Sequence, residues 1–286
     1  MPDLLVAGGG VAGMAAASRA AASGARVLVV EKGERLGGSG ALSPGVLWTV
    51  PDLYAFAEVC PRGDRELGRV LVEGFDGAVE LAREAGVSVS DGWEDHFGFG
   101  RAVRVDVLGL MARWEEDVLA AGGEIRRRSA VHDLVLDGVG AVRGAVVDGE
   151  EIEADAVLLA TGGFQGDRRA VRRFLGPGAD LMPVRANPHS TGDGLRMGRA
   201  VGASLAGPMD GFHGHLVPSP LERFGPPEFV ALSQYHSRHC VLVNQEGRRF
   251  TCEKWGDEVS NLALFGPRAA DAALRTVERS ATHAGS

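Results

Sequence analysis

Three glycines and one acidic residue near the N-terminus have the spacing most indicative of chemistry. Gly8, Gly10 and Gly13 follow a short apolar run as GxGxxG, and a second apolar run ends at Glu31. Such glycines allow a tight strand-to-helix turn, close backbone approach to a pyrophosphate, and close packing of helix on sheet. Because Glu31 can accept hydrogen bonds from an adenosine ribose, the segment predicts binding of FAD or NAD rather than NADP. The alternative is an ordinary glycine-rich turn.

The elements that must position these residues follow from hydrophobic periodicity. Helices are predicted over 64–86, 106–121 and 167–175. Short strands over 130–136, 141–147 and 151–154 are separated by Asp-Gly turns, which predicts an antiparallel meander. The run 156–160 is continuously apolar, which is typical of a central strand buried on both faces. The apolar side of the first helix consists of Leu67, Leu71, Phe75, Ala78, Leu81, Ala82 and Ala85.

The bulk composition limits the class of protein. The 286 residues suffice for one large domain or two, and a net charge of −8 argues against a nucleic-acid backbone as partner. There is no apolar run near the ~20 residues that span a bilayer, and no signal peptide is evident. Three scattered cysteines, Cys60, Cys240 and Cys252, favour a reducing cytoplasm over a disulfide framework or zinc site. The arginines of 126–128 are expected on a solvated face, and 276–286 as a frayed tail.

Further motifs lie along the chain in a fixed order: GGGVAGMAAA, GGSGALSPG, LLATGGF, STGDGL and VNQEGRRF. In this order and rough spacing the chain resembles the flavoprotein subunits of fumarate reductase and succinate dehydrogenase, and the related 3-ketosteroid dehydrogenases. The resemblance implies an α/β, Rossmann-like FAD-binding domain over 1–255 with a β-meander insertion. It also implies a partial substrate-side region at about 205–255. Residues 256–286 would then be a short C-terminal extension.

The resemblance also implies a set of FAD contacts. Where family members attach FAD covalently through a histidine, the aligned residue is Gly38, and no histidine precedes His96, so non-covalent FAD is expected. Helix capping is the alternative role for Thr161 and the TGDG turn. The implied contacts are Gly8, Gly10 and Gly13 with the pyrophosphate; Glu31 with the ribose; Lys32 and the Val131 strand with the adenine; Gly38, Ser39, Ala41, Ser43 and Gly45 with the flavin; Thr161 and Gly162 on the pyrophosphate side; and Asp193 near the flavin.

The chemistry implied by the resemblance is hydride transfer between flavin N5 and a carbon, with a proton moved on the neighbouring carbon. Glu246 and Arg249 would deliver that proton, and His215, preferred over His213, would bind a substrate carboxylate. A surface ion pair and ordinary loop polarity are the alternatives for these residues.

The resemblance ends near residue 255. The family's capping domain and its glycine-rich C-terminal segment are not visible, and Arg268 is only a loosely placed candidate for the family's catalytic arginine. A split enzyme with a second polypeptide, a minimal homodimer and a truncated remnant remain open explanations. The functional hypotheses are therefore an FAD-dependent dehydrogenase or reductase acting on a C–C bond beside a carbonyl or carboxylate of a small molecule, a non-catalytic FAD-binding subunit, and an NAD-binding protein. Any electron partner is expected to be external, since no CxxCH or iron–sulfur pattern occurs.

Overall fold

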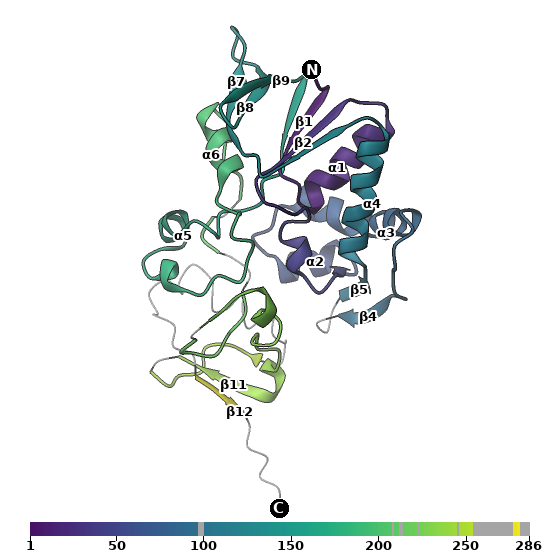
Figure 1. Cartoon of the computed structure of the whole chain (residues 1–286). Coiled ribbons are helices and arrows are strands. Elements are labelled where there is room, and N and C mark those ends of the chain that lie inside the picture. Colours follow the sequence, from purple (N-terminus) through teal and green to yellow (C-terminus); the bar gives the residue numbers. More distant parts are fainter. Residues whose placement is uncertain are drawn as a thin grey trace, which may run out of the picture.

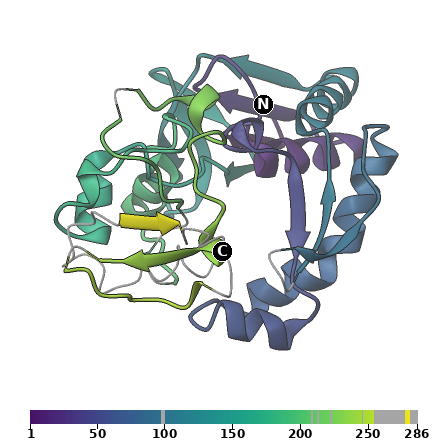
Figure 2. The same ribbon diagram turned by 90° about the horizontal axis from the view of Figure 1, so that it is seen from below.

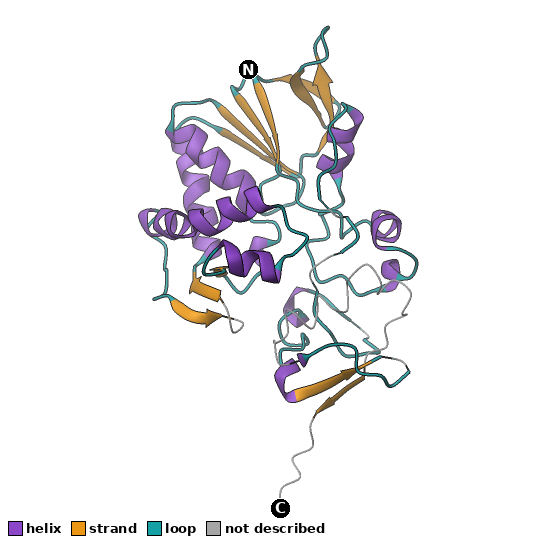
Figure 3. Cartoon of the chain, turned by 180° about the vertical axis from the view of Figure 1, so that it is seen from behind, coloured by secondary structure: helices purple, strands orange, loops and turns teal. Residues whose placement is uncertain are grey.

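A four-stranded parallel sheet, covered on one face by helices and on the other by an antiparallel meander, forms the upper part of the chain (Figure 1). The computed structural model describes residues 1–96, 100–207, 209–211, 214–221, 223–244, 246–253 and 277–280. The view from behind shows the helices on one side of the sheet and the meander beside its other side (Figure 3). Within the described residues, no helix has the length and apolarity needed to cross a membrane.

Up to β6 the elements are β1, α1, β2, η1, β3, α2, α3, β4, β5 and α4 in chain order, and the meander and a less regular lower part follow. The strands are β1 (Leu4–Ala7), β2 (Val27–Glu31), β3 (Val46–Thr49), β4 (Trp93–His96), β5 (Gly100–Arg104), β6 (Glu124–Arg127), β7 (Val131–Leu136), β8 (Val142–Val147), β9 (Glu150–Glu153), β10 (Ala156–Leu159), β11 (Cys240–Val243) and β12 (Val277–Ser280). The α-helices are α1 (Val11–Ala22), α2 (Leu53–Val59), α3 (Arg65–Glu84), α4 (Val107–Ala120), α5 (Arg168–Leu175) and α6 (Asp193–Ala200). Single 3-10 turns are η1 (Gly40–Leu42), η2 (Ala179–Leu181), η3 (Pro226–Glu228) and η4 (Ser237–His239).

The main sheet has the strand order β10-β1-β2-β6, with every pair parallel. Leu5 and Leu28 lie side by side in register and face the meander, whereas Val6 and Val29 face the helices. Both faces of β1 and β2 are therefore buried, which explains why these strands read as continuous apolar runs rather than as alternating ones.

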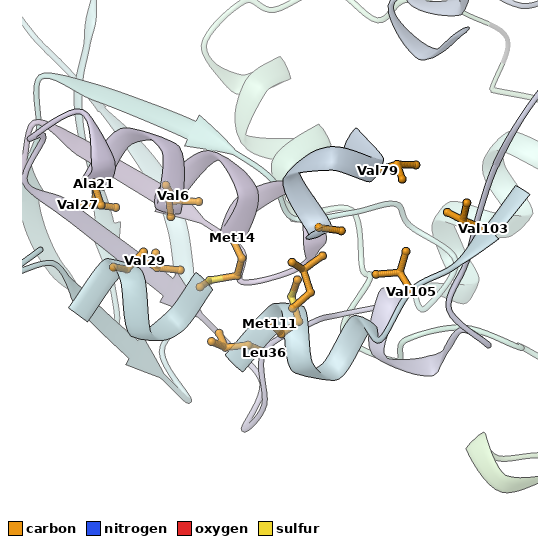
Figure 4. Packing of buried hydrophobic residues seen from close by; sticks show 14 of the residues in the cluster. Val6, Met14, Ala21, Val27, Val29, Leu36, Val79, Val103, Val105 and Met111 are labelled. Carbon is orange, nitrogen blue, oxygen red and sulfur yellow. The ribbon is translucent and has the colours of Figure 1, made fainter. Parts of the chain in front are cut away.

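The larger core lies between the sheet and the helices α1, α3 and α4 (Figure 4). Met14 and Val118 are fully buried where α1 packs beside α4. The same cluster continues through Val79 of α3 to Val103 of β5, so it joins the small antiparallel sheet β3-β5-β4 to the main sheet. Seen from below, this small sheet lies between α3 and the segment that carries β11 (Figure 2).

The predicted helices and meander are present with ends shifted by one or two residues, but three local predictions are wrong. The first concerns α3, whose buried residues are Gly68, Phe75, Val79 and Ala82, while Leu67 and Leu71 are 70% and 51% exposed. Tertiary packing selects a face rotated from the most apolar stripe, because Phe56 occupies the space over Gly68.

The second correction concerns the strand at one edge of the main sheet. The apolar run 156–160 forms β10, an edge strand rather than a central one, and its residues are exposed or half-buried. At the opposite edge the segment 124–127 forms β6, and the arginines there stay on an exposed face as predicted, with Arg127 paired to Glu115 of α4 at 2.6 Å. Sequence periodicity shows how deeply a strand could be buried, but the order of strands in a sheet depends on contacts distant in sequence.

The third correction concerns the predicted tail. Val277–Ser280 form β12, which pairs antiparallel with β11, so part of the segment predicted to fray is a strand. The division into a domain over 1–255 and an extension over 256–286 stays a prediction. Of that extension, only 277–280 lie within the described residues.

Replacing Gly13 with alanine should destabilise the fold. A Cβ at this position would lie 1.9 Å from the Gly8 carbonyl oxygen, so α1 would have to move from β1. We expect a loss of about 1–3 kcal/mol in the free energy of unfolding, measured by urea denaturation. Gly77→Ala on α3 is the control, because a Cβ there meets nothing within 4 Å and should stabilise the helix by about 0.5–1 kcal/mol. Equal effects of the two substitutions would contradict the packing argument.

Candidate functional site

A cavity lies at the carboxyl ends of β1, β2 and β10, where open α/β sheets bind their ligands. Its volume is about 300 Å³. The glycine turn, the end of β2, the 37–40 loop and the start of α6 surround it. The lining residues are Ala7, Gly8, Gly10, Val11, Ala12, Val30, Glu31, Lys32, Gly37, Gly38, Ser39, Gly40, Ser129, Val131, Ala160, Thr161, Gly162, Asn187, His189, Ser190 and Asp193.

The glycine turn is shaped by two close backbone approaches and one open position. Gly8 has φ +111°, and a Cβ on it would lie 2.4 Å from the Ala160 carbonyl oxygen. Gly13 packs α1 against the turn and does not line the cavity. Gly10 is the N-cap of α1, and a Cβ there would meet nothing within 4 Å. The first turn of α1 therefore presents free N–H groups to the cavity across an unobstructed position, as phosphate binding requires.

Glu31 lies at the end of β2 with its carboxylate held by two backbone donors. The Gly9 N–H donates to Oε2 at 2.8 Å and the Gly33 N–H donates to Oε1 at 2.6 Å. The side chain is buried yet lines the cavity. Each oxygen keeps further acceptor capacity, so the fixed carboxylate suits the vicinal hydroxyls of a ribose.

Lys32 connects the end of β2 to the start of α6. Its Nζ donates to Thr191 Oγ1 at 2.7 Å and forms an ion pair with Asp193 at 2.5 Å. Both charged side chains are about one quarter exposed, at 26% and 29%. Thr161, at the end of β10, accepts the Gly194 N–H at 2.9 Å and so caps α6, while it also lines the cavity. Capping and ligand contact are compatible roles for this residue.

The contact between Lys32 and Asp193 conflicts with their predicted places along an extended FAD. Adenine and flavin lie at opposite ends of such a ligand, so one side chain cannot lie beside the adenine and the other beside the flavin. Lys32 follows Glu31 directly, and the ion pair therefore groups Asp193 with the predicted ribose side. The motifs of the family fix only the order of these residues along the chain. The contact between Lys32 and Asp193 depends on how α6 packs beside β2.

Other predicted cofactor residues are divided between the cavity and its surroundings. Gly8, Gly10, Glu31, Lys32, Gly38, Ser39, Val131, Thr161, Gly162 and Asp193 line it. Gly13, Ala41, Ser43 and Gly45 do not. A Cβ on Gly45 would instead lie 2.4 Å from the Val105 carbonyl oxygen, so this glycine serves the packing of β3.

Sequence reasoning missed the polar residues that precede the TGDG motif. Asn187 Nδ2 lies 3.7 Å from the place of a Cβ on Gly38, and His189 Cδ2 lies 3.4 Å from the place of a Cβ on Gly33. Ser190 faces Gly162 in the same way, at 3.2 Å. These residues therefore follow the cavity wall from the Gly38 side to the Glu31 side. The polar string NPHS was the signal that could have indicated them.

The predicted catalytic residues lie outside the cavity lining. His215 packs its ring against Tyr235, with centroids 4.9 Å apart. Glu246 pairs with Arg248 at 2.7 Å, whereas Arg249 Nε donates to Glu253 at 2.9 Å. The structure thus places Glu246 and Arg249 in two different ion pairs. His213 and Arg268 lie outside the described residues.

Glu253 is a buried carboxylate that the sequence did not single out. Its residue is 3% exposed, and its Oε1 accepts the Leu242 N–H of β11 at 2.7 Å. Burial alone would raise the pKa of Glu253, but the hydrogen bonds from Arg249 and Leu242 outweigh it and hold the pKa below its usual value. An acid that stays ionised at neutral pH suits an anchor for β11 better than a proton donor.

Glu253→Gln should destabilise the protein at neutral pH. A carboxyl with a lowered folded-state pKa contributes stability above its ordinary value of 4.5, and the contribution is lost as pH falls through the folded-state value. We expect the free energy of unfolding to fall by about 1 kcal/mol or more at pH 7, and the difference from wild type to become smaller below pH 4.5. Urea denaturation at several pH values measures it. Glu246→Gln, whose side chain is 63% exposed, is the control and should change stability by less than about 0.5 kcal/mol. A difference that is constant with pH would exclude the charged anchor.

Several enzymes are similar to this chain in sequence. The chain is 25% identical to 4-oxocyclohexanecarboxylate 2-dehydrogenase of Sinomonas cyclohexanicum, over 88% of this chain and 58% of that protein. It is 28% identical to a fumarate reductase (cytochrome) of Shewanella frigidimarina, over 88% of this chain and 48% of that protein. The chain therefore spans about half the length of the curated relatives that it matches.

Solved structures share the fold. A 3-ketosteroid-Δ4-(5α)-dehydrogenase from Rhodococcus jostii RHA1 superposes with a TM-score of 0.72 at 22% identity, covering 94% of this chain and 64% of that one. An open-conformation flavocytochrome c3 fumarate reductase superposes with a TM-score of 0.67 at 26% identity, covering 88% and 48%. The FAD binding domain family matches residues 3–281. With the glycine-lined cavity at the carboxyl ends of the parallel strands, this match confirms FAD as the cofactor and shows that the chain belongs to the FAD binding domain family.

Proposed function

We propose that this chain is the FAD-holding part of a dehydrogenase or reductase that transfers hydride between flavin and a C–C bond beside a carbonyl or carboxylate. The observation that carries the proposal is the cavity, where the open Gly10 position and the fixed Glu31 carboxylate fit the two polar ends of an adenosine diphosphate moiety. Bound FAD would supply the hydride chemistry. The relatives named for a cyclohexane ring acid, for fumarate and for a steroid ketone support the class of substrate.

The residues of this chain would bind and orient the cofactor. The α1 N-terminus offers N–H donors and a positive dipole end to the pyrophosphate. The Lys32–Asp193 ion pair ties β2 to α6 across the cavity, which fixes the width of the site. Non-covalent attachment remains a prediction, as do the catalytic roles of His215, Glu246 and Arg249.

We also propose that a second polypeptide completes the site. In the described part of the chain no strand pairs with the outer edge of β10, although β10 is apolar and only half-buried. Such an edge is normally covered or paired. The alternative is a homodimer, in which a second copy of this chain covers the β10 edge and leaves the cofactor site the same. A cytoplasmic location, suggested by the cysteines, stays a prediction.

A non-catalytic FAD-binding subunit is the second candidate function. The observation in its favour is that none of the predicted catalytic residues lines the cavity. The two functions differ in one property: only a catalytic protein would transfer electrons from its reduced flavin to an added acceptor.

Purification of the chain and measurement of its visible absorption spectrum test whether it binds FAD. We expect bound FAD that is released on denaturation, as measured by mass analysis of the supernatant. Anaerobic reduction followed by fumarate, urocanate or 4-androstene-3,17-dione should then reoxidise the flavin at a rate above that of buffer alone. Bound flavin that no acceptor reoxidises would favour the non-catalytic subunit. A colourless protein that binds NADH would contradict both.

Gly10→Val should weaken FAD binding while the apoprotein stays folded. Gly10 has extended backbone at φ −74°, which valine adopts readily, and its side chain would enter the cavity where the pyrophosphate is expected. We expect at least a tenfold increase in the Kd for FAD, about 1.4 kcal/mol, measured by flavin fluorescence titration of apoprotein. Because valine is a poorer N-cap than glycine, the free energy of unfolding of the apoprotein should fall by about 1 kcal/mol, which leaves the protein folded. Unchanged FAD affinity would place the pyrophosphate elsewhere.

A further inference from the structure

Helix α3 carries a row of apolar side chains that the described part of the chain leaves exposed. The exposed fractions are 70% for Leu67, 62% for Val70, 51% for Leu71 and 42% for Leu81. Their spacing of three or four residues, or multiples of it, places them along one side of the helix, and three small residues continue the row. We call the whole row the α3 stripe: Leu67, Val70, Leu71, Gly74, Gly77, Ala78 and Leu81.

The stripe is separate from the side of α3 that packs on the protein. The buried residues Gly68, Phe75, Val79 and Ala82 face the core, and the charged side chains occupy a third side of the helix. A helix that contacts only its own core and water needs one apolar side, whereas α3 has two. A contiguous exposed apolar patch of this kind marks an interaction surface.

Two glycines in the middle of the stripe have no function within the described chain. Gly74 and Gly77 lack the positive φ that favours glycine, and a Cβ on either would meet nothing within 4 Å. Glycine inside a helix costs stability relative to alanine. A missing side chain lets another backbone approach closely, so these positions fit a partner that packs tightly against the centre of α3.

The order of large and small residues along the stripe fits a second α3 in the opposite direction. Consider a two-fold axis through Gly74, which makes each contact occur twice. Leu71 of one copy then lies beside Ala78 of the other, and Val70 lies beside Gly77. At each end Leu67 meets Leu81, whose distances from Gly74 along the helix are equal. The larger residues near the axis thus face small ones.

The charges of α3 also favour the antiparallel direction. The N-terminal half, before Glu73, has two arginines and one glutamate, a net charge of +1, and the C-terminal half has one arginine and four acidic residues, a net charge of −3. An antiparallel pair brings each basic half beside an acidic half, and it also opposes the two helix dipoles. A parallel pair would place the two acidic halves together.

We propose that the α3 stripe binds a second copy of this chain and forms an antiparallel homodimer with Gly74 on its two-fold axis. This surface differs from the edge of β10, because α3 packs against β3 and α2 on the helical side of the molecule (Figure 1). A dimer through α3 is therefore independent of the proposed function and leaves the β10 edge open for a second polypeptide.

Sedimentation of the full chain at about 1–500 µM measures the association. We expect a reversible monomer–dimer equilibrium, and Leu71→Gln should raise the dimer Kd about tenfold or more, with helix content unchanged by circular dichroism. Leu119→Gln on α4 is the matched control, since Leu119 is 50% exposed, and it should leave the Kd within about twofold.

Gly74→Leu distinguishes the close pair from nonspecific adhesion. The substitution adds apolar surface, so nonspecific association would become stronger. In the proposed dimer two leucine side chains would collide on the axis, and the Kd should rise about tenfold or more.

Disulfide crosslinking tests the direction and register of the two helices. Cys60→Ser and Cys252→Ser first remove the two exposed cysteines. In that background, mild oxidation should join Gly74→Cys to its own copy. Leu67→Cys should crosslink only when it is mixed with Leu81→Cys, because positions 67 and 81 are 14 residues, about 21 Å, apart along one helix.

Each of four results would overturn the proposal. They are a chain that stays monomeric over the whole concentration range, an equal effect of Leu119→Gln and Leu71→Gln, a dimer that Gly74→Leu leaves unchanged or strengthens, and a Leu67→Cys protein that crosslinks to itself. FAD binding by the monomeric variants is measured separately, so failure of the dimer leaves the proposed function intact.

Discussion

The rest of the structure depends on close backbone contact at one turn. The Gly8 Cα lies against the Ala160 carbonyl, and Gly13 lies against the Gly8 carbonyl, with no room for a Cβ at either place. These two contacts bring β1, α1 and β10 together at the carboxyl end of the sheet. Because the strands converge there without intervening side chains, the space beyond them remains a cavity bounded by backbone donors and the fixed Glu31 carboxylate, among other groups.

A small set of polar contacts then connects that turn to the rest of the site. Thr161 caps α6, and Lys32 joins α6 to β2, so the helix position is set by the same strand ends that form the cavity. The segment before α6 supplies Asn187, His189 and Ser190 to the wall of the cavity.

The predicted cofactor residues and the predicted catalytic residues differ in how far the nearby sequence determines their surroundings. The GxGxxG turn, Glu31 and the meander depend on neighbouring residues, so spacing alone predicted them. Of the fourteen cofactor residues predicted by spacing and by the family resemblance together, ten line one cavity. Glu246 and Arg249 were placed by motif alone, and their partners depend on the fold of the segment after β11. Leu67 and Leu71 show the same limit, since a helix can bury a face other than its most apolar stripe.

The sequence by itself determined the class of cofactor and the local geometry that binds it, because glycine spacing, an acidic strand end and apolar runs act within a few tens of residues. Only the tertiary structure decided that β10 is an edge strand, that Lys32 meets Asp193 and that Arg185 meets Tyr235. Those contacts join residues 50 to 161 positions apart. No local sequence pattern predicts a contact of this kind, because the contact depends on the packing of every element between the two residues.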